Sequence, residues 1–264
     1  MSASPAPNQR ARLQQQQQAE AKQKQLRLLI VVGLIVIALV VVGIFTLVLV
    51  QKLGNSEPVA TGDQQRPPNA TEANGVMVTS QGTQPADDVP TVVIYEDYQC
   101  PACAAREEAY GPALKQLVDA GEIKVERVLA TFLDIRLQND SSVRAAQAAS
   151  AADAVGKFRE YHEVVFANQP REGVGYTEQQ LRVDFPALAG ITGDDLTKFQ
   201  ELYDAKVFTD FVAASDARLV PDGVNSTPTF KVNGNDLVFY DREKEQLLIE
   251  PTPESMLAAI KATA

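Results

Sequence analysis

The sequence predicts an α/β domain in which a mainly helical block separates the strands of one sheet, preceded by a single transmembrane helix. Three observations predict this organisation. An unbroken apolar run covers residues 28–50, a β-branched strand pattern at 91–95 leads into a helix, and a strand-turn-strand pattern returns at 229–240 after a long helical stretch. The domain that follows the apolar run therefore takes its strands from both of its ends.

The two ends of the chain differ in charge. The 264 residues carry a formal net charge of −10, but residues 1–52 contain six basic side chains and a single acid, Glu20. The remainder is therefore strongly acidic. Nucleic-acid binding needs clustered Lys and Arg to neutralise phosphates, so the acidic body excludes nucleic acid as a partner. With 45% hydrophobic residues, the chain is long enough to bury a sizeable core.

The apolar run at 28–50 predicts the transmembrane helix. Its 23 residues include one polar side chain, Thr46, and at about 1.5 Å per residue they cross a hydrocarbon core about 30 Å thick. A buried core helix would have a polar face, and a cleaved signal peptide would have a shorter apolar stretch and a cleavage site of small residues. Five basic side chains precede the run and only Lys52 follows it closely, which places the N-terminus in the cytoplasm. We therefore expect a single-pass protein of the cell membrane with an extracytoplasmic body.

Two polar segments flank the predicted span. Residues 1–27 form a basic, Gln-rich cytoplasmic tail. Residues 51–88 are rich in Pro, Gly, Asn, Thr and Gln and contain almost no large apolar side chains, which predicts a flexible linker. Within it, residues 75–79 are expected to add a short edge strand to the domain. The folded domain then covers residues 89–264.

The first half of the domain contains two strands and a helix. Residues 91–95, Thr-Val-Val-Ile-Tyr, have the pattern of a short buried strand. Apolar residues then recur at helical spacing until Gly121, and residues 123–129 predict a second strand. Cys100 therefore lies at or just before the N-terminus of the helix.

The second half begins with the helical insertion, at about residues 130–220. Separate helices are expected at 141–154, around 158–166, from Thr177 and from Asp194. The strand pattern then returns.

A hairpin and a helix close the domain. An Asn-Gly turn at 233–234 joins strands predicted at 229–232 and 237–240, which is a strong hairpin signal. Thr-Pro-Glu at 252–254 offers an N-cap, a proline at the first helical position and an acid in the first turn. We therefore expect a C-terminal helix.

The chain has two cysteines, Cys100 and Cys103. A disulfide between them closes too short a ring to add much stability, and a fold stapled by disulfides has more cysteines, spread along the chain. At a helix start, this spacing gives instead a thiolate that the helix N-terminus stabilises and a second thiol that resolves a mixed disulfide. We expect Cys100 to attack and Cys103, one turn further in, to resolve. Pro101 at the first helical position costs no helix hydrogen bond.

Zinc binding is the alternative for this cysteine pair. A structural zinc site needs four ligands, and the chain offers only His162 as a further soft ligand, so no metal is expected. His162 lies four residues after Phe158 and four before Phe166, on the apolar stripe of its helix. It is expected to be a packed, hydrogen-bonded core residue, in preference to a catalytic base.

Two further features of the sequence each allow two interpretations. Glu96 and Asp97 either tune Cys100 and relay protons to Cys103, or are ordinary loop acids. Pro228 either starts a strand, or is a cis-proline that holds the preceding backbone open for a substrate. The residues alone leave both questions open.

Three stretches together resemble the DsbA-like branch of the thioredoxin superfamily. They are residues 96–103, Glu-Asp-Tyr-Gln-Cys-Pro-Ala-Cys, residues 158–169, and residues 223–234, which contain Thr-Pro-Thr-Phe. The resemblance covers the chain from Val89 to its end. It implies a thioredoxin-like fold with a helical insertion.

The resemblance also implies a site and partners. Thr227-Pro228 is expected to be a cis peptide bond packed against the active-site disulfide, with Thr227 offering its backbone to the substrate chain. Members oxidise, or less often reduce or reshuffle, disulfides in exported proteins, so the expected partners are exported unfolded or thiol-containing proteins. Oxidising members are usually recharged by a quinone-linked membrane protein of the DsbB or VKOR type. No cofactor is expected.

Two departures from these relatives affect the expected chemistry. Oxidising relatives of the best-known type have histidine where this chain has Ala102, so one group that stabilises the Cys100 thiolate is absent and a milder oxidant is expected. Ile94 occupies a position six residues before Cys100 where such relatives carry a buried acid. Proton transfer to the resolving thiol must then rely on Glu96, Asp97 or water.

The sequence thus predicts an enzyme, an extracytoplasmic dithiol oxidase that forms disulfides in exported proteins. A disulfide reductase or isomerase on the same fold is the first alternative, and it would be found largely reduced in the living cell. The second alternative belongs to another class, a non-enzymatic tethered binding module or chaperone.

Overall fold

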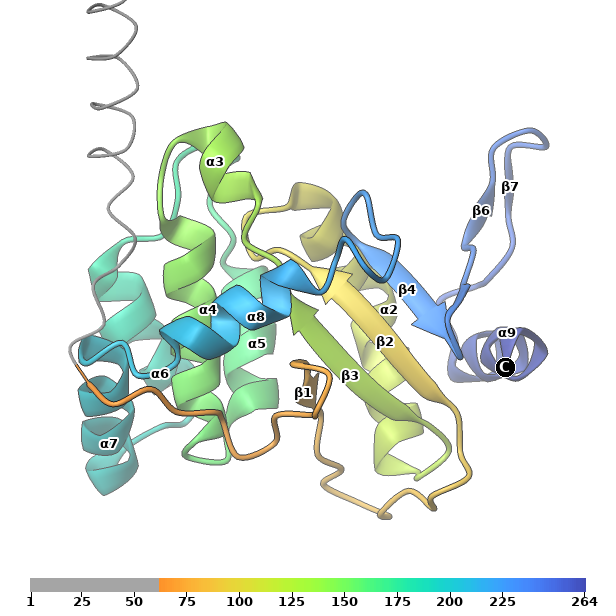
Figure 1. The fold of residues 1–264 in the computed structure, drawn as a ribbon. Helices are drawn as coiled ribbons and strands as arrows, with labels where there is room; N and C mark the ends of the chain where they lie inside the picture. The colour runs from red at the N-terminus through yellow and green to blue at the C-terminus, as the bar shows by residue number, and fades with distance from the viewer. Residues whose placement is uncertain (1–61) are drawn as a thin grey trace, which may run out of the picture. The chain divides into compact units, whose positions relative to one another are not determined.

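A five-stranded mixed sheet forms the centre of residues 62–264, the part of the chain that the computed structural model describes (Figure 1). The strand order is β1-β3-β2-β4-β5; β2 and β3 run parallel, and the other neighbours are antiparallel. The predicted α/β class, with strands from both ends of the domain, is confirmed. The strands are β1 (Val76–Met77), β2 (Thr91–Glu96), β3 (Lys124–Leu129), β4 (Thr229–Val232) and β5 (Asn235–Asp236).

Helices cover both faces of this sheet. Val92 and Ile94 are two residues apart on β2, so they face the same side, and both are fully buried. Helices α2 (Pro101–Asp119) and α9 (Pro253–Thr263) pack over that side. Figure 1 shows α8 (Thr209–Ala217) crossing β3 on the opposite side.

The helical insertion is built around α4 (Ser141–Asp153). Six alanines of this helix are fully buried, and their small side chains let neighbouring helices approach closely. Helix α4 contacts α3 (Leu133–Leu137), α5 (Phe158–Ala167), α7 (Gly193–Asp204) and α8. The insertion therefore runs from α3 to α8, in agreement with the predicted residues 130–220.

The helix predicted from Thr177 has the expected cap but an unusual continuation. The Gln180 N–H donates to Thr177 Oγ1 at 3.1 Å, and the Thr177 N–H donates to Gln180 Oε1 at 2.9 Å. A π-helical turn, η1 (Gln180–Asp184), follows and leads into α6 (Phe185–Leu188). Pro186 has no N–H to bond the carbonyl four residues earlier, so the turn widens there.

The predicted hairpin turn is confirmed, but the strand predicted at 237–240 is wrong, because the second strand is a shorter one that directly follows the turn. Residues 233–234 have φ angles of 51° and 82°, the positive values that this turn requires. The second strand is β5, which ends at residue 236. Beyond it, the Phe239 ring packs 4.8 Å from that of Phe230 and 4.7 Å from that of Tyr110. This packing takes the chain away from the strand ladder.

The last part of the chain holds one unpredicted and one predicted element. A second hairpin, β6 (Tyr240–Asp241) and β7 (Gln246–Leu247), projects from the domain (Figure 1). Helix α9 begins where the sequence predicts, and the Thr252 hydroxyl accepts the Ser255 N–H at 3.2 Å as its cap.

The predicted flexible linker needs correction for residues 62–88, which pack on the domain. Gly62 and Gln65 donate backbone hydrogen bonds of 3.1 and 2.7 Å to the turn between α7 and α8. Val76 is fully buried in β1, which is the short edge strand expected at 75–79. A polar segment can be held by its backbone groups, and composition does not report those bonds.

The predicted tail at 1–27 and span at 28–50 lie outside the described residues. Among residues 62–264, no helix is both long and apolar enough to cross a membrane.

Candidate active site

Cys100 and Cys103 lie at the N-terminus of α2. Cys100 is the N-cap residue, with an extended backbone (φ −80°, ψ 115°), and Pro101 follows within the first turn. The Cys103 N–H donates to the Cys100 carbonyl at 3.0 Å, so the two residues are separated by one turn. Cys100 is 7% exposed and Cys103 only 2%, whereas Pro101 and Ala102 face solvent. The helix start lies where the sequence predicts it.

The loop before β4 lies against Cys100. Thr227-Pro228 is a cis peptide bond, as the resemblance implied. The Cys100 thiol donates to the Thr227 carbonyl at 3.5 Å. Strand β4 begins directly after this bond and pairs with β2, with Thr229 opposite Tyr95. The sheet register therefore brings the proline loop to the start of α2.

Asp97 ties the loop before Cys100 to the helical insertion. Its carboxylate accepts hydrogen bonds from the Gln99 N–H at 2.9 Å, the Ser142 hydroxyl at 2.5 Å and the Leu133 N–H at 3.2 Å. The Asp97 carbonyl also accepts the Cys100 N–H at 2.9 Å. Asp97 is therefore a buried structural acid that positions the N-cap cysteine.

Gln99 was missed by the sequence analysis. Its side-chain amide donates to Asp134 at 2.7 Å, and to Asn139 and Ser142 at 2.9 Å each. Gln169 holds the other side of the same loop through two backbone carbonyls, at 2.8 and 3.0 Å. These partners lie at least 35 residues from Gln99 in the sequence, so no local pattern reveals them.

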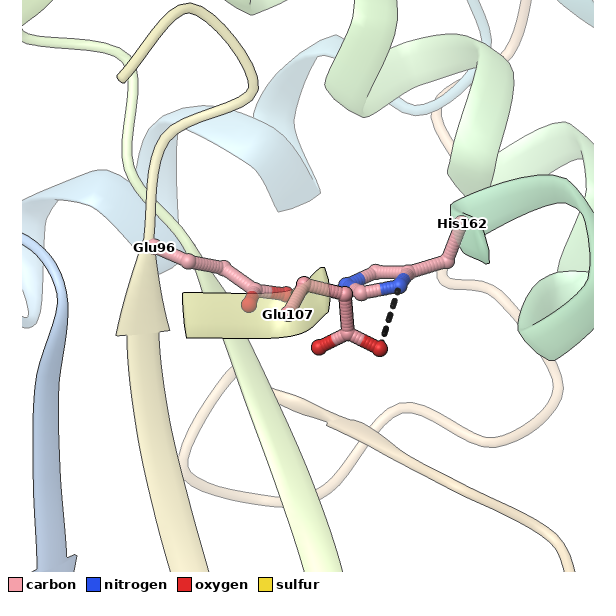
Figure 2. Close-up of side chains that lie close together, drawn as sticks. All are labelled: Glu96, Glu107 and His162. Atoms are coloured by element: carbon pink, nitrogen blue, oxygen red, sulfur yellow. Dashed lines mark hydrogen bonds and ion pairs between the residues drawn. The ribbon is translucent and has the colours of Figure 1, made fainter. Parts of the chain in front are cut away.

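Three buried side chains and one partly buried side chain, from four elements, form what we call the buried charge cluster: Glu96 of β2, Arg127 of β3, His162 of α5 and the partly buried Glu107 of α2. His162 Nε2 lies 2.6 Å from Glu96 Oε1. Arg127 binds both carboxylates, with Nη1 2.7 Å from Glu96 Oε2 and Nη2 3.0 Å from Glu107 Oε2. Figure 2 shows Glu96 and His162 reaching toward each other, with Glu107 beside them.

The buried charge cluster contains metal-ligand types but already has its own cation. Ligand atoms of Glu96, Glu107 and His162 lie within 4.8 Å of one another, the one such group found among residues 62–264. The guanidinium of Arg127 pairs with both carboxylates, where a metal ion would otherwise balance their charge. The zinc alternative would need His162 beside the cysteines, and the cysteines do not belong to this group.

His162 is packed among aromatic rings. Its ring centroid lies 5.6 Å from that of Tyr98, 5.7 Å from Phe158 and 4.9 Å from Phe166, and the residue is 2% exposed. The prediction of a packed, hydrogen-bonded core histidine is confirmed. Its hydrogen-bond partner, Glu96, was not predicted.

Comparison with known proteins agrees with this geometry. The family model described as thioredoxin matches residues 77–262. The chain belongs to the thioredoxin family.

Several relatives of this thioredoxin-family chain are named for disulfide chemistry. Disulfide bond formation protein D of Bacillus subtilis (strain 168) is 28% identical over 197 residues, covering 68% of this chain and 83% of that protein. The reduced disulfide bond oxidoreductase DsbG of Mycobacterium tuberculosis has a TM-score of 0.55 at 25% identity, covering 74% of this chain and 89% of its own. Reduced DsbA of the same organism has a TM-score of 0.55 at 26% identity, with 72% and 92% covered. The chain is therefore a thiol–disulfide oxidoreductase with a DsbA-like thioredoxin fold.

The thioredoxin-family site gives its two thiols opposite properties. A hydrogen bond from the Cys103 thiol has the largest effect on the pKa of Cys100. Burial opposes it, but the side chain of Thr227 and the N–H groups of Cys103 and Ala102 add to it, and together they lower the Cys100 pKa to about 6. At neutral pH Cys100 is therefore mainly a thiolate, the form that attacks disulfides.

Cys103 keeps its proton. Burial raises its pKa well above the ordinary value, and the neighbouring Cys100 and the charge of Glu96 raise it further. Chemically, the pair consists of a nucleophile that is a thiolate at neutral pH and a more deeply buried thiol that ionises only with help.

The two acids that the sequence left open differ in their surroundings. Burial opposes the ionisation of Glu96, but Arg127 and His162 outweigh it, and the Glu96 pKa is lowered. Burial raises the pKa of Asp97 to about 7, against the hydrogen bonds that lower it. Glu96 is thus a charged group that acts on Cys103 through its field, and neither acid is an ordinary exposed loop residue.

Proposed function

We propose that this chain is a membrane-anchored, extracytoplasmic dithiol oxidase that forms disulfides in exported proteins through Cys100 and Cys103. The observation that carries the proposal is the lowered pKa of Cys100, about 6. A stabilised thiolate stabilises the reduced form of the pair, which makes its disulfide a better oxidant.

The exchange proceeds in two steps. A substrate thiolate attacks the Cys100 sulfur of the Cys100–Cys103 disulfide; the S–S bond breaks, and Cys103 leaves with the electron pair and takes up a proton. A second substrate thiolate then attacks the substrate sulfur of the mixed disulfide, and Cys100 leaves as a thiolate. The substrate has lost two electrons, and the enzyme holds them as a dithiol.

The cis-proline loop supplies a place for the substrate chain. The Thr227 carbonyl lies 3.5 Å from the Cys100 sulfur, so an extended peptide beside this loop would bring its own cysteine to Cys100. Backbone pairing does not depend on side-chain identity, which suits an enzyme that handles many unfolded thiol proteins.

The location and the recharging partner rest on the sequence. The apolar run at 28–50 and the basic residues before it support an anchored domain outside the cytoplasm. The dithiol must pass its two electrons on, and the DsbA-like resemblance supports a quinone-linked membrane protein of the DsbB or VKOR type as the acceptor.

The test combines trapping with a redox measurement in intact cells. Cys103→Ala blocks resolution, so it should accumulate mixed disulfides with exported proteins, whereas Cys100→Ala should trap none. Alkylation of living cells should find the wild-type pair mainly oxidised. A pair found mainly reduced, or a reduction potential near the thioredoxin value of about −270 mV, would contradict an oxidase and favour a reductase or isomerase.

A further inference from the structure

We propose that the buried charge cluster carries protons between Cys103 and solvent, with His162 as its central member. This inference rests on the proposed function, because it assigns residues to the proton that the exchange step requires. The route leaves the active site on the side away from the substrate, through a groove between α2 and α5.

Cys103 needs a proton route that Cys100 does not need. When the disulfide opens, the electron pair goes to the Cys103 sulfur, which must bind one proton. When the disulfide is remade, Cys103 must lose it. Cys103 is 2% exposed, so bulk water does not reach its sulfur directly. Cys100 attacks and leaves as a thiolate and exchanges no proton in these steps.

The first member of the route lies at the end of β2. The Glu96 charge raises the pKa of the Cys103 thiol, and the N–H of Asp97, the next residue in the chain, lowers it. Glu96 is itself 3% exposed, so it cannot exchange protons with bulk water unaided.

His162 offers one ring nitrogen to each carboxylate. Its Nε2 lies 2.6 Å from Glu96 Oε1, a hydrogen-bond distance. Its Nδ1 lies 4.0 Å from Glu107 Oε1, which exceeds a hydrogen bond and matches a contact bridged by water. Imidazole takes a proton at one nitrogen and releases one at the other, so His162 can connect the two carboxylates.

A small cavity adjoins the buried charge cluster. Its volume is about 20 Å³, enough for one water molecule, and Glu107, Arg127, Arg159 and His162 contribute to its lining. Arg127 Nε and Arg159 Nη2 are buried donors without a hydrogen-bond partner among the described residues. A water in this cavity would satisfy such donors and bridge His162 to Glu107.

A larger groove connects this cavity with solvent. It has a volume of about 330 Å³, and Glu107, Gly111, Lys115 and Glu163 line both spaces. Lys115 and Glu163 form a solvent-exposed ion pair of 3.1 Å, with side chains 44% and 40% exposed. A β-carbon at Gly111 would lie 2.5 Å from Glu107 Oε1. The absence of a side chain at Gly111 therefore allows the Glu107 carboxylate to lie at the groove.

The proton balance is simple. As Cys103 leaves the disulfide, one proton passes from groove water through Glu107 and the cavity to Nδ1 of His162. A proton then leaves Nε2 for Glu96 and reaches the Cys103 sulfur. One proton enters for each S–S bond broken, and the cluster regains its starting charges. The same path runs in reverse when the disulfide is remade.

The experiment separates the two cysteines kinetically. The reduced full-length protein is mixed with oxidised glutathione; Cys100 attacks in a second-order step, and Cys103 then releases glutathione in a first-order ring closure. Ring closure should slow about 10-fold or more in His162→Gln between about pH 6 and 8, with the attack by Cys100 changed less than about twofold. Added imidazole should restore ring closure in His162→Ala.

The matched control is Glu160→Gln, in the same helix but paired with Lys157 outside the buried charge cluster. It should leave both steps unchanged. Equal slowing of both steps in His162→Gln, or no change in ring closure, would overturn the relay. If Cys100 of the wild-type protein does not attack oxidised glutathione, that result contradicts the proposed function and not the relay. If His162→Gln does not fold, Glu107→Gln decides the matter by the same comparison.

Discussion

His162 Nε2 lies 2.6 Å from Glu96 Oε1, with 3% and 4% of the two side chains exposed. This contact joins the helical insertion to the last residue of β2. Arg127 completes it from β3, because its guanidinium binds Glu96 and Glu107 together. The insertion and the sheet are therefore connected by one set of mutually dependent charges.

Loss of Arg127 should destabilise the fold strongly. Arg127→Leu leaves the buried Glu96 and the partly buried Glu107 without their counter-ion, and breaking a buried pair from one side costs about 3–5 kcal/mol in the free energy of unfolding. Urea denaturation at neutral pH measures it. Arg182→Leu is the control, since its ion pair with Asp204 is largely exposed and should cost less than about 1 kcal/mol. A similar small loss in both variants would contradict the paired role of Arg127.

The two thiols should titrate far apart. Ultraviolet thiolate absorbance of the reduced protein should show one transition near pH 6, from Cys100. Cys103→Ala removes the hydrogen bond with the largest effect, so the midpoint should rise. Cys103→Ser keeps a donor at that place and should shift it less. A wild-type midpoint at the ordinary cysteine value of about 8.5 would contradict the assignment.

Asp97 should make stability fall as pH rises. Its folded-state pKa is raised from 3.8 to about 7, so between these values the folded protein holds a proton that the unfolded chain has released. The stabilisation is complete below about pH 4 and is lost as pH rises through 7, at no more than about 1.4 kcal/mol per pH unit. The free energy of unfolding of wild type and of Asp97→Asn is measured by denaturation across this interval. As pH rises, the wild type should lose stability relative to the variant. Parallel pH profiles would refute this.

The sequence predicts the parts of the site that depend on neighbours along the chain. Pro101 and the apolar spacing after it place Cys100 at a helix start, and positive φ angles at 233–234 follow from the Asn-Gly pair. Both are local effects of backbone geometry, so a single stretch of sequence contains them.

The rest depends on contacts between distant segments. Glu96 and His162 are 66 positions apart, and it is the packing of α5 against α2 that brings them together. The helical spacing of His162 correctly indicates burial, but burial does not identify a partner. In the same way, the polar composition of residues 62–88 does not report the backbone bonds that hold Gly62 and Gln65 to the insertion.

Ala102→His should make the protein a stronger oxidant. Ala102 is exposed directly after Pro101, and its N–H already helps to lower the pKa of Cys100. An imidazole there would add a donor or a positive charge beside the thiolate and would stabilise only the reduced form. Each tenfold gain raises the reduction potential by about 30 mV, which equilibration with glutathione measures. Ala102→Gln places a neutral side chain of similar length at that position and should stay near the wild-type potential. An equal reduction potential in all three proteins would mean that the side chain at position 102 does not affect the stability of the Cys100 thiolate.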